Sequence, residues 1–187
     1  EDGIRDDISC LVGSEMCIRD RLLVAPFALA GEHGPGALKV DVDKVVEQGA
    51  VSPVDGITSA GQPDEAALGV FAESGYVAVI DMRTAGEDRG IDEPAAVEGL
   101  GMEYVAFPIG GDDITLEKAK ELDELLLQYD QPVLLHCGSG NRVGALLALR
   151  EFLASGDAEK SLQIGKDGGL TGLEGKVRDA LEAADEQ

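Results

Sequence analysis

The chain is poor in aromatic residues, and this limits how its core can be built. Tryptophan is absent and aromatic residues make up 4% of the 187 positions. Leu, Val, Ile and Ala must therefore fill the interior. Apolar residues account for 44% of the chain, which is enough for one packed domain at this length. We expect a fold rich in helices and aliphatic strands.

Histidine and cysteine are also scarce. The two histidines, His33 and His136, lie far apart in the sequence. The three cysteines, Cys10, Cys17 and Cys137, follow neither a disulfide framework nor metal-ligand spacing. We therefore expect no metal site and no cofactor.

Basic residues are few compared with acidic ones. The chain has 15 Lys and Arg against 37 Asp and Glu, a formal net charge of −22. Such a surface repels nucleic acid and anionic membranes, so we expect neither as a partner. It also repels anionic substrates at long range. A phosphate site would need local positive potential.

The N-terminal segment does not read as part of a domain. Residues 1–21 sustain no helical or strand period and resemble a translated sequencing adapter, as in a metagenomic reading frame. We interpret them as an artefactual or disordered extension. Residues 22–30 resemble the end of a secretory signal, which predicts a periplasmic or secreted protein. In the alternative, cytoplasmic reading this apolar run packs on the core. It is too short to span a bilayer.

The remaining pattern predicts an α/β domain. Residues 31–50 form a weakly helical lead-in, and residues 51–187 form a single domain in which apolar strand patterns alternate with helical ones. This alternation predicts a mostly parallel central sheet of about four to five strands flanked by helices on both faces. In such sheets a site lies beyond the carboxyl ends of the strands. Three loops satisfy that condition, those after Met82, Phe107 and His136.

The loop after His136 carries the clearest chemistry. Its glycines allow consecutive amide N–H groups to turn toward one centre, and the following helix adds its positive N-terminal dipole. Arg142 offers a fork of donors for an oxyanion. The same field favours a nucleophilic thiolate at Cys137, and His136 is expected to orient the loop. The predicted anion-binding residues are Gly138, Ser139, Gly140, Asn141, Arg142 and Val143.

At this point a family resemblance is visible. Residues 56–63, 79–83, 136–144 and 165–171 resemble the bacterial phosphatase-like domains that occur alone or fused to beta-lactamase-like hydrolases. More distantly, the order of elements is similar to that of dual-specificity phosphatases. The resemblance implies a cysteine-phosphatase-like fold and hydrolysis of a phosphoester through a phosphocysteine on Cys137, with Arg142 binding the phosphoryl group. The implied substrate is a phosphorylated small molecule or a phosphoprotein.

The resemblance also implies an aspartic acid that protonates the leaving oxygen. The loop after Phe107 offers Asp112 and Asp113, and we favour Asp112. Asp113 has a simpler interpretation as the cap of the helix that starts near Thr115. Arg83 either adds positive charge for the substrate or pairs with Glu87 as a scaffold contact.

Two departures from the family pattern leave other functions open. Only four residues separate Cys137 from Arg142, whereas the phosphatase signature has five. The shorter loop has the length typical of rhodanese-like sulfurtransferases, which would carry a persulfide on Cys137. Val143 stands where phosphatases usually have Ser or Thr. A sulfurtransferase and a non-catalytic anion-binding module therefore remain as alternatives.

Overall fold

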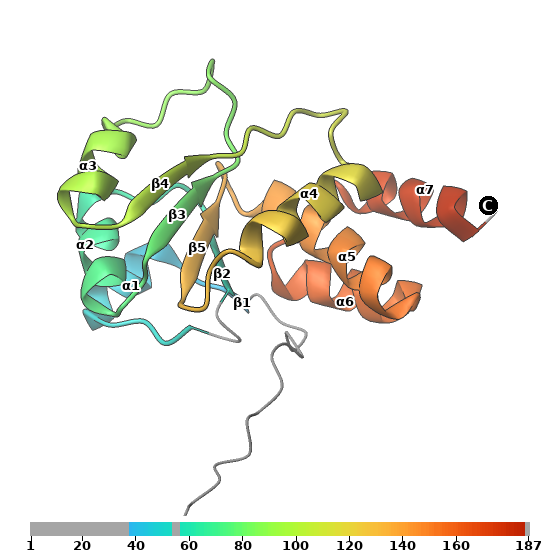
Figure 1. Ribbon diagram of the computed structural model, residues 1–187, viewed down its shortest axis with the longest axis horizontal. Helices are drawn as coiled ribbons and strands as arrows, with labels where there is room; N and C mark the ends of the chain where they lie inside the picture. Colours follow the sequence, from blue (N-terminus) through green and yellow to red (C-terminus); the bar gives the residue numbers. More distant parts are fainter. Residues whose placement is uncertain (1–37, 54–56, 186–187) are drawn as a thin grey trace, which may run out of the picture. The chain divides into compact units, whose positions relative to one another are not determined.

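The computed structural model describes residues 38–53 and 57–185, which contain one five-stranded sheet. All strand pairs are parallel and the order is β1-β2-β5-β3-β4 (Figure 1). The predicted mostly parallel sheet is confirmed. Our expectations for residues 1–21, 22–30 and 31–37 lie outside the described residues. The strands are β1 (Leu38–Lys39), β2 (Ile57–Ala60), β3 (Ala78–Asp81), β4 (Glu103–Ala106) and β5 (Val133–His136).

Helices cover both faces of the sheet, as predicted (Figure 1). Within the described ranges no helix has the length and apolar character needed to cross a membrane. One face carries α1 (Val42–Gln48), α2 (Glu65–Glu73) and α3 (Glu93–Gly99). The other carries α4 (Leu116–Leu126), α5 (Asn141–Ser155), α6 (Ala158–Asp167) and α7 (Glu174–Asp185).

Each central strand divides its side chains between two aliphatic cores. Val79 and Leu134 pack with α2 and α3, whereas Ile80 and Leu135 pack with α4 and α5. All four are fully buried. Successive strand residues point to opposite faces, so a strand with helices on both sides must be apolar throughout. This explains why these strands read as continuous apolar runs.

The lead-in contributes more to the fold than the sequence indicated. Helix α1 agrees with the weakly helical prediction, but β1 was not predicted. It adds an edge strand, with Leu38 opposite Thr58 and Lys39 opposite Ser59. The Val40 N–H extends this pairing by donating to Ser59 O at 2.8 Å. Two residues are too few to show a strand period.

Most of the helices begin with a side-chain cap, and α5 does not. A side-chain oxygen caps the first turn of α1, α2, α3, α4 and α6. Helix α5 follows Gly140, which has a φ of 83°, and no side chain caps it. The cap of α4 is Thr115, so our interpretation of Asp113 as that cap is wrong. The capping residues are Asp41, Asp64, Asp92, Thr115 and Asp157.

Glycines bring α5 and α6 into backbone contact. A Cβ on Gly144 would lie 2.2 Å from the Leu170 amide nitrogen and 2.5 Å from Gly165 O. A Cβ on Gly165 would lie 2.7 Å from the Ala148 side chain. No larger residue fits at either position without moving backbone. This contact fixes where the start of α5, and the loop before it, lies.

Candidate active site

The three loops expected to form the site meet at Arg142, in the first turn of α5. Its Nη1 donates to Met82 O, just after β3, at 3.3 Å and to Ile109 O, after β4, at 3.0 Å. Both Nη atoms also bond Glu87 in the loop after β3. The guanidinium therefore holds together the carboxyl ends of β3, β4 and β5. That is the position at which parallel sheets bind ligands.

Cys137 lies at the floor of the loop between β5 and α5. The residue is 1% exposed, whereas Gly138 and Ser139 above it are exposed. The Gly140 N–H donates to Cys137 Sγ at 3.1 Å. Hydrogen bonding and the uncapped helix end both stabilise negative charge on the sulfur. Cys137 is thus placed as a nucleophile would need to be.

Several amides around this sulfur have no protein acceptor. Among the described residues, the backbone N–H groups of Ser139, Asn141, Arg142 and Val143 donate to no protein atom. Free N–H groups at the start of a helix form an anion-binding site together with the helix dipole. The arrangement fits the predicted cradle, with the backbone rather than side chains as its main donor.

The side chains of two predicted cradle residues are used elsewhere. Asn141 Oδ1 accepts the Thr171 N–H at 2.8 Å and the Leu173 N–H at 3.4 Å, which ties α5 to the segment before α7. Val143 is fully buried in the core. Only the backbone of either residue is available to an anion.

Glu87 is the closest partner of the Arg142 guanidinium. Nη1 lies 2.6 Å from Oε1 and Nη2 lies 2.6 Å from Oε2, a bidentate pair. The hydrogen bonds from Arg142, together with those from Thr84, hold the pKa of Glu87 well below its usual range. The pKa of Arg142 is raised, chiefly by Glu87 and also by the nearby Cys137 sulfur. Nε and the second hydrogen of Nη2 remain for a ligand.

A chain of polar contacts continues from Glu87 behind the loop. Arg83 Nε lies 3.3 Å from Glu87 Oε2, and Arg83 Nη1 donates to Gln62 Oε1 at 2.5 Å. Gln62 Nε2 in turn donates to Glu93 Oε2 at 3.0 Å. Of the two interpretations of Arg83, these contacts support the scaffold one. The sequence had suggested its pairing with Glu87, but not the link through Gln62.

The chain ends at His136, whose ring is completely buried next to Cys137. Its Nε2 lies 2.7 Å from Glu93 Oε1, but the N–H direction departs from that of a well-formed hydrogen bond. Asp81 Oδ1 lies 3.7 Å from the same nitrogen. The ring therefore contacts α3 and β3, so it can orient the loop only by fixing the strand end before it.

Arg89 supplies the positive charge of this buried cluster. Its guanidinium lies 2.5 Å from Asp81 Oδ2 and 3.7 Å from Glu93 Oε2. The Tyr104 hydroxyl donates to the same Asp81 oxygen at 2.7 Å. Ligand atoms of Asp81, Glu93 and His136 lie within 4.8 Å of one another, a spacing that could hold a metal ion. Because Arg89 already balances the carboxylates, a cation there would have to displace it.

The two candidate acids occupy different environments. The Asp112 side chain is fully exposed, and its Oδ1 lies 3.5 Å from Lys176 Nζ of α7. Lys176 also donates to Gly111 O. Asp113 Oδ2 accepts the Gly110 N–H at 2.7 Å and closes the loop. Asp112 is thus the one with a carboxyl group facing solvent, although it does not contact the cysteine loop.

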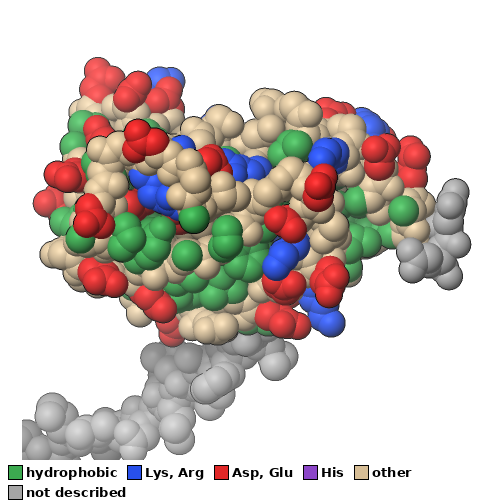
Figure 2. Space-filling view, turned by 90° about the horizontal axis from the view of Figure 1, so that it is seen from above, with side chains coloured by type: hydrophobic (Ala, Val, Ile, Leu, Met, Phe, Trp, Pro, Cys, Tyr) green, Lys and Arg blue, Asp and Glu red, His purple; other side chains and the backbone are tan. Residues whose placement is uncertain are grey.

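Two cavities flank the loop between Cys137 and Arg142. One of about 480 Å³, the Arg142 cavity, is lined by Arg142, Glu87 and the backbone at Gly110 and Gly111. The other, of about 530 Å³ and called here the Lys39 cavity, is lined by Lys39, Gly138 and Ser139, among others. Figure 2 views the molecule from above and shows basic side chains near the middle of that face, with acidic ones mostly toward its margins.

Comparison with known proteins assigns the chain to a family. Residues 45–154 match the family described as the phosphatase-like domain of beta-lactamase hydrolase-like proteins. The chain belongs to this family. The match contains β2 to β5 and most of α5, and therefore the whole cysteine loop.

Curated relatives of this phosphatase-like domain are longer proteins. The beta-lactamase hydrolase-like protein of Agrobacterium fabrum is 31% identical over 101 residues, which are 52% of this chain and 23% of that protein. Its counterpart from Xylella fastidiosa is 34% identical over 97 residues, 50% of this chain and 22% of that protein. The chain therefore spans less than a quarter of the length of the relatives it matches.

Solved structures with the same fold are phosphatases. A proposed phosphatase of Neisseria meningitidis superposes with a TM-score of 0.58 at 19% identity, covering 66% of this chain and 92% of that one. Kinase associated phosphatase, solved with its catalytic-site cysteine changed to serine, gives a TM-score of 0.54 at 18% identity, covering 70% and 85%. The predicted cysteine-phosphatase-like fold is confirmed.

Proposed function

We propose that the chain is a cysteine-dependent phosphatase that cleaves a phosphoester through a phosphocysteine on Cys137. The observation that carries this proposal is the loop itself. A buried sulfur, free helix-end amides and an arginine with unused donors converge on one point. Membership of a phosphatase-like family supports the reaction class, and the fold relative with a catalytic-site cysteine supports the nucleophile.

In the first half of the reaction, the thiolate of Cys137 attacks phosphorus. A sulfur–phosphorus bond forms and the bond to the leaving oxygen breaks. Arg142 and the loop amides bind the equatorial phosphoryl oxygens, where charge gathers in the transition state. Asp112, in its protonated form, gives its proton to the leaving oxygen. A rotation of the exposed loop around Gly110 and Gly111 would bring its carboxyl group over the Arg142 cavity.

In the second half, water attacks phosphorus and the sulfur–phosphorus bond breaks. The Asp112 carboxylate accepts a proton from that water, and Cys137 leaves as thiolate. Val143 offers no hydroxyl to stabilise the departing sulfur, so the Gly140 N–H at 3.1 Å is the donor placed for this task. The products are an alcohol and inorganic phosphate. The substrate class remains a phosphorylated small molecule or a phosphoprotein.

Steady-state assays with the full chain test the proposal. Wild type should hydrolyse p-nitrophenyl phosphate between pH 5 and 8, and Cys137→Ser should remove the activity while leaving the circular dichroism unchanged. Val143→Ser should raise kcat if breakdown of the phosphocysteine limits turnover. Absence of hydrolysis in wild type, across that pH range and with a panel of phosphoesters, would refute the proposal.

Sulfur transfer is the second candidate, and loop length favours it. Four residues between Cys137 and Arg142 make a smaller cradle than five, one that suits a persulfide on the cysteine. This reaction needs no general acid. Thiocyanate formed from thiosulfate and cyanide by wild type, but not by Cys137→Ser, would identify it. The same protein preparations should be used for both assays.

A further inference from the structure

The edge strand that the sequence did not reveal places a lysine at the cysteine loop. Lys39 ends β1 and lies opposite Ser59 of β2, at the carboxyl edge of the sheet. Its methylene stem crosses two glycines with left-handed backbone. A Cβ on Gly140 would lie 3.1 Å from Lys39 Cε, and one on Gly169 would lie 2.8 Å from Cδ. The stem therefore occupies a groove that only glycine leaves open at these two positions.

Lys39 differs from nearly all other basic residues in having no acidic partner. Within the described residues, every other Lys and Arg except Lys120 has a carboxylate within 4.0 Å. In a chain of net charge −22, an unpaired cation beside an anion-binding loop is unexpected from composition. Its charge is free to meet a ligand.

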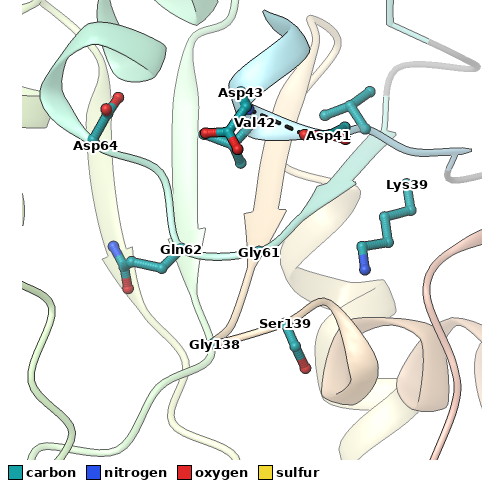
Figure 3. A pocket seen from close by; sticks show the side chains of 10 residues that line it. Lys39, Asp41, Val42, Asp43, Gly61, Gln62, Asp64, Gly138 and Ser139 are labelled. Carbon is teal, nitrogen blue, oxygen red and sulfur yellow. Dashed lines mark hydrogen bonds between the residues drawn. The ribbon is translucent and has the colours of Figure 1, made fainter. Parts of the chain in front are cut away.

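The ammonium group is directed into a cavity that adjoins the loop. Gly138 and Ser139, at the exposed tip of the loop, line the Lys39 cavity together with Lys39. Figure 3 shows the Lys39 amine directed toward the end of this cavity where Ser139 lies. The cavity, of about 530 Å³, is separate from the Arg142 cavity on the other side of the loop. A substrate held in the loop can therefore extend a second group toward Lys39.

Carboxylates confine an anion to the Lys39 end of the cavity. Asp41, Asp43 and Asp64 line the opposite end in Figure 3. Asp41 and Asp64 cap the helices that follow them, and Lys44 lies 4.0 Å from Asp41. Their presence is thus explained by helix capping. They would repel an anion placed near them, which leaves the space between Lys39 and Ser139 as the favourable position.

We propose that Lys39 binds a second anionic group of the substrate, a phosphate or a carboxylate, outside the cysteine loop. The preferred substrates would then be phosphoesters that carry such a group close to the scissile phosphate. This inference rests on the proposed function for the reaction, but anion binding at Lys39 can be measured without turnover.

The binding experiment uses the full chain with Cys137→Ser, titrated calorimetrically with inorganic phosphate and with pyrophosphate. Lys39→Met in this background should weaken pyrophosphate binding about threefold to tenfold and phosphate binding less than twofold. Lys120→Met, the exposed unpaired lysine of α4, is the matched control and should change neither affinity. Circular dichroism and urea unfolding verify that each variant is folded.

The kinetic experiment compares phenyl phosphate with 3-carboxyphenyl phosphate in the catalytic protein. Lys39→Met should lower the ratio of their kcat/KM values by a similar threefold to tenfold, with the phenyl phosphate rate nearly unchanged. Equal losses on both substrates would overturn the inference, because they indicate a general field effect. Unchanged pyrophosphate affinity would also overturn it. Lys39-dependent pyrophosphate binding without any turnover would instead refute only the phosphatase reaction.

Discussion

Arg142 and Glu87 form a bidentate pair in which each guanidinium Nη lies 2.6 Å from one carboxylate oxygen. Glu87 is further held by the Thr84 N–H at 2.9 Å and by Arg83. The pair fixes the plane of the guanidinium and leaves Nε and part of Nη2 toward the sulfur. Arg142 is therefore aimed by a residue that has no direct part in the proposed reaction.

Glu87→Gln tests this aiming. The amide keeps the shape but loses one acceptor and the charge, so kcat/KM should fall about tenfold to a hundredfold. Glu98→Gln, on the exposed side of α3, is the matched control and should leave kcat/KM within twofold of wild type. Full activity in Glu87→Gln would show that Arg142 needs no partner to be positioned.

The same pair predicts how stability depends on pH. The folded-state pKa of Glu87 is depressed, so the unfolded chain takes up the proton first as the pH falls. The contribution of Glu87 is fully present above about pH 5 and declines below about pH 4.5. The difference in unfolding free energy between wild type and Glu87→Gln should shrink over that range in urea titrations. A constant difference from pH 6 to pH 3 would contradict this assignment.

The tyrosines should ionise late. Burial and the Asp81 hydrogen bond raise the pKa of Tyr104 to about 12, burial and Glu103 raise that of Tyr129 to about 12, and burial raises that of Tyr76. A raised folded-state pKa contributes stability below about pH 10, which is lost as the pH rises toward 12. Phenolate absorbance should be small at pH 10.5 in the folded protein and nearly complete by pH 11.5 in guanidinium. Half-titration at pH 10 with native circular dichroism would be inconsistent with these environments.

The contact between α5 and α6 should not accept a methyl group at Gly144. A Cβ there meets backbone at 2.2 Å and 2.5 Å, so Gly144→Ala should destabilise the fold by about 1–3 kcal/mol. Gly175→Ala in α7 has open space and should stabilise it by about 0.5–1 kcal/mol through helix propensity. Urea unfolding measures both, and opposite signs are expected. A neutral Gly144→Ala would mean that the two helices are packed less closely.

General acid catalysis by Asp112 depends on the leaving group. Asp112→Asn should lower kcat about a hundredfold with phenyl phosphate, and much less with 2,4-dinitrophenyl phosphate, whose leaving group needs no proton. Asp130→Asn, another exposed aspartate, should affect neither substrate. An equal loss on both substrates would assign Asp112 a structural role through Lys176 instead.

Much of the fold and of the loop could be predicted from the sequence because both are local. Strands covered on two faces must be apolar throughout, which made β3 and β5 visible, and the glycines, Cys137 and Arg142 are contiguous. The partners of these residues could not be predicted. Glu93 lies in a polar stretch that suggests a solvent-exposed helix start, yet it is fully buried because His136, Gln62 and Arg89 surround it.

Lys39 shows the same limit for the edge of the sheet. Its strand is two residues long and follows a glycine-rich segment, so no period identifies it. What brings Lys39 to the loop is pairing with β2 and the groove over Gly140 and Gly169, contacts between segments far apart in the chain. Only the closed sheet makes such a neighbour apparent.

The central claim is that a phosphoryl group becomes attached to Cys137. Wild type mixed with a dinitrophenyl phosphate and quenched within milliseconds in acid should yield, by peptide mass spectrometry, a Cys137 peptide heavier by one phosphoryl group. Burst release of dinitrophenol should match the amount of that adduct, and Cys137→Ser should show neither. Steady hydrolysis with an unmodified Cys137, or hydrolysis that survives Cys137→Ser, would contradict the account.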